Sequence, residues 1–127
     1  MPDLIDMLKI RQIESSNDPS AVNPRTGAIG FYQIMPKGKR GALDEWNQFH
    51  PKQTYQDKDL YEPNINYNIA NWYMNKRIPQ MLKHYKIPDT LENRLASYNF
   101  GIGNVKSGNP LPTETTNYIK KYLNETP

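Results

Sequence analysis

The chain has 127 residues, no cysteine and a formal net charge of +3. The length suits one domain, residues 1–127, with a core of its own, and the missing cysteines exclude a disulfide scaffold, a zinc ribbon, an iron–sulfur site and a thiol nucleophile. No stretch is apolar over the length of a membrane-spanning helix, and the first residues lack the pattern of a secretory signal. The basic residues accompany no motif that reads nucleic acid.

The first segment has the pattern of an amphipathic helix. We predict that it begins at Pro2, a residue suited to a helix N-terminus, and runs to about Glu14 or Ser15. Its expected buried face holds Leu4, Ile5, Leu8 and Arg11, with Met7 beside them. Residues 17–20 include Asp18-Pro19 and end the helix.

The next part of the chain is expected to be irregular before it becomes helical. Residues 21–30 are rich in turn-forming residues and leave room for a small β-hairpin. A short helical piece is predicted at residues 31–35, ended by Pro36, and another helix at about residues 40–49. Residues 50–62 have the composition of a loop.

Helices dominate the second half. One begins near Pro63 and is kinked or restarted at Pro79, and its apolar stripe holds Ile65, Ile69, Trp72 and Tyr73. Asp89 and Glu92 form a predicted capping box for the next helix, which residues 101–103 end. The last helix, capped by Thr113, has one face made of Thr115, Tyr118, Ile119 and Tyr122. The fold class is therefore mainly α, with room for a small β-hairpin between the first two helices.

Glu14 is the first candidate for chemistry. It lies at the C-terminal end of the first predicted helix, next to apolar side chains. The partial negative charge of a helix C-terminus and an apolar setting both favour a carboxyl group that stays protonated. Such a group can donate a proton to a leaving glycosidic oxygen. The alternative is a solvated glutamate at a fraying helix end.

The segment around Gln33 combines glycines with aromatic and amide side chains. Gly27 and Gly30 permit close approach of the backbone to a ligand, and Gln33 offers both a donor and an acceptor. Phe31 and Tyr32 are suited to wall a cleft. The alternative is a turn followed by a core helix.

Two later segments carry weaker signals. Tyr98 and Asn99 close a helix just before Gly101 and Gly103. Because these glycines follow a helix and not a strand, a dinucleotide site is excluded, and Asn99 alone is suited to be a C-cap residue. Residues 112–118 on their own indicate only a well-capped helix.

In their order and spacing these segments resemble one family, the soluble lytic transglycosylases, whose catalytic domain shares a lysozyme-like fold with goose-type lysozyme. The family pattern is Glu-Ser, Gly-Leu-Met-Gln, Ala-Tyr-Asn and a tyrosine in the final helix. The matching residues are Glu14-Ser15, Gly30-Phe31-Tyr32-Gln33, Ser97-Tyr98-Asn99 and Tyr118, with Phe31, Tyr32 and Ser97 as departures, and Pro63, Asn66 and Tyr73 also fit. The resemblance covers about residues 4–123.

The resemblance implies that Glu14 is the single catalytic acid and base. It would protonate the oxygen between N-acetylmuramic acid and N-acetylglucosamine in peptidoglycan. It would then take the proton of the muramic acid 6-hydroxyl, which closes on C1 to give a 1,6-anhydro end. The implied substrate-binding residues are Ser15, Tyr32, Gln33, Tyr98, Asn99 and Tyr118, the last of them near Glu14. The expected partner is the glycan strand, bound by a monomer without cofactor, metal, nucleic acid or membrane insertion.

Two other functions are compatible with the same residues. A lysozyme-type hydrolase on this fold would use water where a transglycosylase uses the 6-hydroxyl. A peptidoglycan-binding module without activity is disfavoured, because Glu14 is present within the Glu-Ser motif of the transglycosylases. The expected place of action is the bacterial cell wall, in the periplasm or outside the cell. The missing signal pattern is compatible with a phage-encoded endolysin or with a leader that has been removed.

Overall fold

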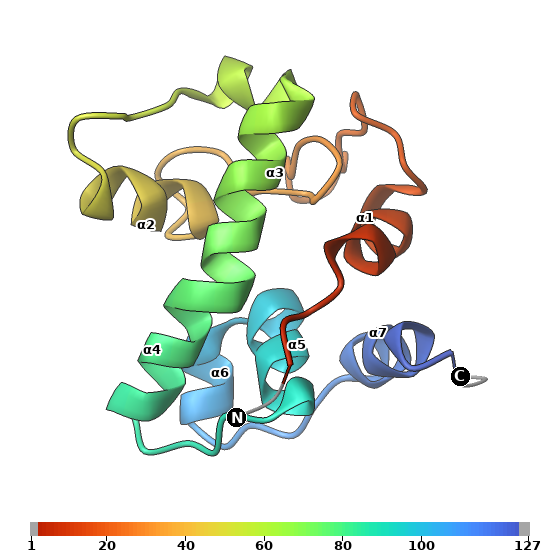
Figure 1. Cartoon of the computed structure of the whole chain (residues 1–127). Coiled ribbons are helices and arrows are strands. Elements are labelled where there is room, and N and C mark those ends of the chain that lie inside the picture. The colour runs from red at the N-terminus through yellow and green to blue at the C-terminus, as the bar shows by residue number, and fades with distance from the viewer. Residues whose placement is uncertain (1–2, 125–127) are drawn as a thin grey trace. The chain divides into compact units, whose positions relative to one another are not determined.

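The computed structural model describes residues 3–124, whose parts can be followed by colour in Figure 1. Their contacts divide them into two compact units. One unit is Met7–Tyr73, and the other joins residues 3–6 to residues 74–124. Both units are helical, and no strand forms among the described residues. The expected mainly α fold class is confirmed.

The first unit contains α1 (Met7–Ser15), α2 (Ala42–Phe49), the 3₁₀ turn η1 (Asp57–Tyr61) and α3 (Pro63–Trp72). Both α2 and η1 pack against α3. The core of this unit consists of side chains that are at most 2% exposed: Ile10, Tyr32, Ile34, Leu43, Leu60, Asn66 and Ile69. Asn66 is the exception among them, because it is polar and wholly buried.

The first helix begins later than its pattern suggests, and the predicted buried face is wrong at Leu4 and Leu8, although Ile5 is buried as predicted. Leu4 and Leu8 are 74% and 63% exposed, whereas Met7 and Ile10 are buried. The backbone before the helix belongs to the second unit. There, the Ile5 N–H donates a hydrogen bond to Asn75 Oδ1 at 2.7 Å. Residues 3–6 therefore do not continue the helical period. The predicted start at Pro2 lies outside the described residues.

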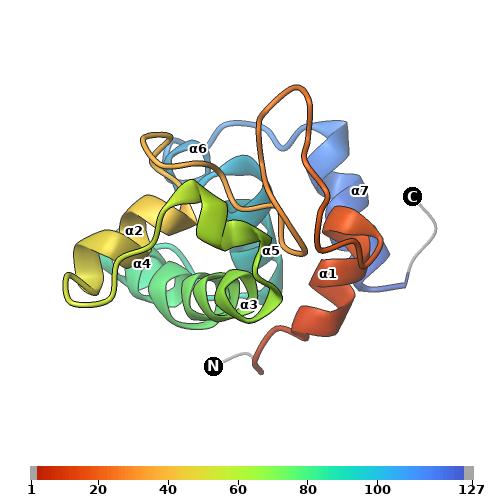
Figure 2. The ribbon, with the colours of Figure 1, turned by 90° about the horizontal axis from the view of Figure 1, so that it is seen from above.

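Residues 21–36 form neither the hairpin nor the short helix expected of them. Only two isolated antiparallel bridges occur, Val22 with Ile29 and Ile29 with Ile34. Ile29 and Ile34 exchange both backbone hydrogen bonds, at 2.9 and 3.0 Å, and close a tight turn between them. The helix predicted at residues 31–35 is therefore wrong, and Figure 2 shows the stretch as a loop between α1 and α2.

Aromatic rings join α2 to α3. The Trp46 ring stacks on His50 at 3.8 Å and meets the edge of Trp72 at 5.5 Å. The predicted helix at residues 40–49 is confirmed as α2, and the predicted start at Pro63 is confirmed for α3. The loop predicted at residues 50–62 contains η1, whose capping box is made by Gln56 and Asp59. This short turn has no apolar period by which the sequence could reveal it.

The second unit contains most of the π-helical turn η2 (Tyr73–Arg77), then α4 (Ile78–His84), α5 (Leu91–Phe100), α6 (Ile102–Lys106) and α7 (Thr113–Tyr122). Helix α5 packs against α4, α6 and α7, and α4 also packs against α6 (Figure 1). Pro79 is the second residue of α4. The predicted start of a new helix at Pro79 is therefore confirmed, with the helix beginning one residue earlier. The face predicted for the last helix is confirmed, with Thr115, Tyr118 and Tyr122 buried.

Two helix N-caps in this unit differ from the prediction. Thr90 and not Asp89 is the N-cap of α5, because its side chain accepts a hydrogen bond from the Asn93 N–H at 3.1 Å. Pro112 and not Thr113 is the N-cap of α7. Gly101 ends α5 as predicted, but it also begins α6, a helix too short to be seen as a period.

Asp89 has a different role, because it pairs with the buried Arg94. Arg94 is 2% exposed, and its Nε and Nη2 donate to the two carboxylate oxygens at 2.6 and 2.9 Å. The hydrogen bond from Arg94 is the main cause that lowers the pKa of Asp89, with the guanidinium charge adding to it and burial opposing it. A lowered pKa in the folded state means stability that is present above the unfolded pKa and is lost as pH falls through the folded one.

We expect Asp89→Asn to destabilise the protein at neutral pH by about 3 kcal/mol, because it removes the charge that compensates a buried guanidinium. The difference between wild type and variant should shrink at acid pH, where the wild-type carboxylate is protonated. Urea unfolding at pH 7 and at a pH below the lowered pKa of Asp89 checks this. An equal difference at both pH values would show that the ion pair is not the cause.

Candidate functional site

Glu14 lies in the last turn of α1 and is partly exposed. The helix ends there because Ser16 and Asn17 adopt the left-handed conformation, with φ of 54° and 63°. The Ser15 hydroxyl donates to the Arg11 carbonyl at 3.2 Å and accepts the Asp18 N–H at 3.2 Å. The helix end that presents Glu14 is thus fixed by local hydrogen bonds, in which the Ser15 side chain takes part.

Asp18 is the carboxylate nearest to Glu14 in sequence, and it belongs to a turn. Its Oδ1 accepts the Ser20 N–H at 2.9 Å. The interpretation of Asp18-Pro19 as the turn after the helix is confirmed. One oxygen of Asp18 is therefore engaged in local structure.

The segment with Gln33 is linked to α1 through Arg11. The Arg11 Nε donates to Asn17 Oδ1 at 2.8 Å, and its guanidinium lies 4.7 Å from the centre of the Phe31 ring. A cation over an aromatic face at this distance is attractive. Two of the predicted segments, around Glu14 and around Gln33, are therefore held together within one unit.

Gln33 is the last residue of the turn closed by Ile29 and Ile34, and its φ is 50°. Its side-chain Nε2 donates to the carbonyls of Ala21 and Gly30, at 3.2 and 3.0 Å. The amide donor, expected to be available to a ligand, is thus used by the protein itself. What Gln33 offers to a ligand is its carbonyl oxygen, an acceptor.

Asn66 on α3 holds this turn in place and was not singled out as a site residue. Its Oδ1 accepts the Tyr32 N–H at 3.0 Å, and its Nδ2 donates to the carbonyls of Ile29 and Leu60, both at 2.9 Å. A Cβ atom on Gly30 would lie only 2.4 Å from Asn66 Nδ2. The available signal was a polar residue three positions before Ile69 on the buried face of a helix.

The aromatic pair of the turn is divided between core and surface. Tyr32 is 1% exposed and packs against Tyr67, with ring centres 5.9 Å apart. Phe31 is partly exposed and meets the Tyr32 ring edge-on at 6.3 Å. Of the two predicted wall residues, Phe31 is the one with accessible ring surface.

Tyr98, Asn99 and Tyr118 lie in the second unit. Tyr98 and Asn99 are partly exposed in the last turn of α5, and Tyr118 is 5% exposed on α7. Asn99 Oδ1 accepts the Thr115 hydroxyl at 2.8 Å, which joins α5 to α7. The C-cap of α5 is Gly101, so the simple capping role considered for Asn99 is wrong. Thr115 was not among the predicted site residues.

In the part of the chain that the structure describes, no group of three or more His, Cys, Asp or Glu side chains is placed to hold a metal ion. The helices of residues 3–124 also include none with the length and apolar character of a membrane span.

Comparison with known proteins adds to this geometry. The family model described as the transglycosylase SLT domain matches residues 4–120. The structure is similar to the crystal structure of the 70 kDa soluble lytic transglycosylase from Escherichia coli, with a TM-score of 0.75 and 26% sequence identity over 97% of this chain. The chain spans 21% of that protein's length. A search of curated proteins gives no match.

Proposed function

The chain belongs to the transglycosylase SLT domain family, and we propose that it is a lytic transglycosylase that cleaves the MurNAc–GlcNAc β-1,4 bond of peptidoglycan. The family consists of lytic transglycosylases, and its model covers nearly the whole chain. The observation that carries the proposal is the position of Glu14. It lies in the last turn of α1, within the matched residues, at a helix end fixed by its neighbours.

Glu14 would act first as an acid and then as a base. Its proton goes to the bridging oxygen as the bond from C1 to that oxygen breaks, and the oxygen of the 2-acetamido group stabilises the positive charge at C1. The carboxylate then takes the proton of the 6-hydroxyl as O6 bonds to C1. Because the proton lost in the first step is regained in the second, one carboxylate suffices. The engagement of Asp18 with the Ser20 N–H supports this reading.

The remaining predicted residues are proposed to bind the sugars. Gln33 contributes an acceptor oxygen, suited to the N–H of an acetamido group, because its own N–H groups are bound to Ala21 and Gly30. Asn99, held by Thr115, has amide N–H groups suited to sugar oxygens. The full proposed set is Ser15, Gln33, Tyr98, Asn99 and Tyr118. Tyr32, the other residue predicted to bind sugar, is 1% exposed and therefore belongs to the core.

The activity is tested by incubating the protein with purified peptidoglycan and measuring soluble muropeptides. Release of fragments supports an enzyme, and binding to sacculi without any release would make the chain a binding module. The hydrolase alternative differs only in its product, since water would give reducing muramic acid ends in place of anhydro ends.

We further propose that the chain acts as a monomeric domain on the bacterial cell wall. The family's action on peptidoglycan places the substrate there. A phage endolysin and a periplasmic wall enzyme would both perform this reaction, and their difference lies in how the protein reaches the wall. Lysis of intact cells by added protein would favour the first.

A further inference from the structure

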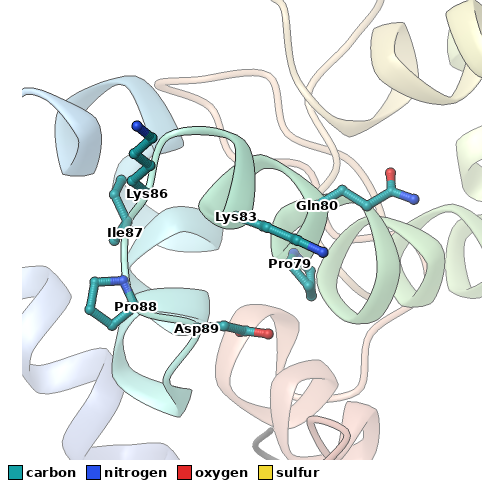
Figure 3. A pocket seen from close by; sticks show the side chains of 7 residues that line it. All are labelled: Pro79, Gln80, Lys83, Lys86, Ile87, Pro88 and Asp89. Atoms are coloured by element: carbon teal, nitrogen blue, oxygen red, sulfur yellow. The ribbon is translucent and has the colours of Figure 1, made fainter.

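A pocket of about 710 Å³ lies in the second unit, where α4 ends and the chain turns toward α5 (Figure 3). Its volume is within the usual range for small-molecule or peptide sites. Pro79, Gln80 and Lys83 line it from α4, and Lys86, Ile87, Pro88 and Asp89 line it from the connection to α5. None of these residues belongs to the proposed catalytic or sugar-binding set.

The walls of the pocket are fixed before any ligand arrives. The chain leaves α4 through a Schellman motif, in which the Ile87 N–H donates to the Leu82 carbonyl at 2.9 Å and the Lys86 N–H to the Lys83 carbonyl at 3.1 Å. On the other side, the Pro88 carbonyl accepts Asn93 Nδ2 at 2.8 Å. A site built from such segments loses little conformational freedom when it binds.

The pocket carries uncompensated positive charge. Lys83 and Lys86 are exposed, and neither has a carboxylate partner among residues 3–124. Asp89 does not neutralise them, because both of its oxygens are bound by the buried Arg94. Figure 3 shows Lys83 extending from α4 toward Pro79 and Lys86 extending from the loop in a different direction, so that the two charges lie at separate places.

Lys86 occupies a backbone position that normally belongs to glycine. It is the left-handed residue of the Schellman motif, with φ of 58°, and a side chain there is conformationally unfavourable. The lysine therefore places a charge beside the pocket where glycine would fit the backbone better. This position also offers a variant that removes the charge and relieves the backbone at once.

We propose that this pocket binds the peptide arm of peptidoglycan, through its carboxylates and small aliphatic side chains; the choice of this peptide rests on the proposed function. The separated lysines match carboxylates at two points of one ligand. Pro79, Ile87 and Pro88 supply apolar surface for short aliphatic groups. Asp89 retains acceptor capacity for peptide N–H groups. A bare phosphate chain offers neither N–H donors for Asp89 nor aliphatic groups for the apolar surface of the pocket.

The test uses the full chain and the tripeptide L-Ala-γ-D-Glu-meso-diaminopimelate in isothermal titration calorimetry. We expect the wild type to bind it, and Lys83→Ala with Lys86→Gly to weaken the affinity at least tenfold. Lys86→Gly alone should weaken binding while keeping or raising the melting temperature, because glycine suits the backbone there. Lys120→Ala with Lys121→Ala removes the same charge from exposed positions of α7 and should leave the affinity unchanged.

The outcomes separate this site from the proposed function. Absence of tripeptide binding at millimolar concentration, equal weakening by both double variants, or tighter binding of polyphosphate than of tripeptide would overturn the peptide site. Cleavage of peptide-free glycan strands reports on the catalytic proposal alone. A chain that cuts such strands without binding the tripeptide would refute only the pocket, and one that binds the tripeptide without cutting would refute only the proposed function.

Discussion

Glu14→Gln is expected to lower the release of soluble fragments from peptidoglycan by at least about 100-fold, the range for loss of a general acid. Glutamine matches the shape of glutamate but carries no acidic proton to give and accepts none as a carboxylate does. Because Glu14 lies at a partly exposed helix end, the variant should fold normally. Initial rates of dye release from labelled peptidoglycan, together with melting temperatures, measure both effects.

Asp18→Asn is the matched control. It removes a carboxylate four residues away but keeps an oxygen that accepts the Ser20 N–H. Its activity should stay within about twofold of wild type. If Asp18→Asn lost as much activity as Glu14→Gln, or if Glu14→Gln kept most of the wild-type rate, the single-carboxylate mechanism would be wrong.

Asn66→Ala is expected to give the largest loss of stability, about 3 kcal/mol or more. The side chain satisfies the Tyr32 N–H and the carbonyls of Ile29 and Leu60, and it is wholly buried. Without it, the Tyr32 N–H and the Leu60 carbonyl lose the amide that binds them, whereas the Ile29 carbonyl keeps the Ile34 N–H. Each buried group left unsatisfied costs about 1–3 kcal/mol. Urea unfolding of wild type and variant gives the difference in free energy.

Asn47→Ala provides the comparison for Asn66→Ala within the same unit. The Asn47 side chain makes two hydrogen bonds to the Tyr55 backbone, at 3.0 and 2.8 Å, but it is only partly buried. Water can replace those bonds, so the loss should be about 1 kcal/mol. A loss at Asn66 no larger than at Asn47 would mean that the Gln33 turn does not depend on this buried amide.

The helices with a clear apolar period were predictable from sequence. Pro63 marked the start of α3, and the buried face of α7 followed from Thr115, Tyr118 and Tyr122. The errors arose where hydrogen bonds to distant residues override the local pattern. The Ile5 N–H is bound by Asn75, seventy residues away, so the first helix starts at Met7 and exposes Leu8.

The candidate site shows the same division. Glu14, Gln33 and Asn99 stood out because of residue type and spacing, yet what their side chains offer depends on partners that spacing does not reveal. Gln33 looked like a donor and an acceptor, but Ala21 and Gly30 use its donor. Asn99 looked like a cap, but it is bound by Thr115. The pocket at the connection between α4 and α5 has no sequence signature. It is formed by the path of the chain between the two helices and by the ion pair of Asp89 with Arg94.

The most direct test of the proposed transglycosylase is mass spectrometry of the muropeptides that the protein releases from purified peptidoglycan, with Glu14→Gln run beside it. The proposed mechanism predicts products whose muramic acid ends are lighter by one water than hydrolysis products, and predicts their absence with the variant. Reducing muramic acid ends would contradict it and would assign a hydrolase on the same fold.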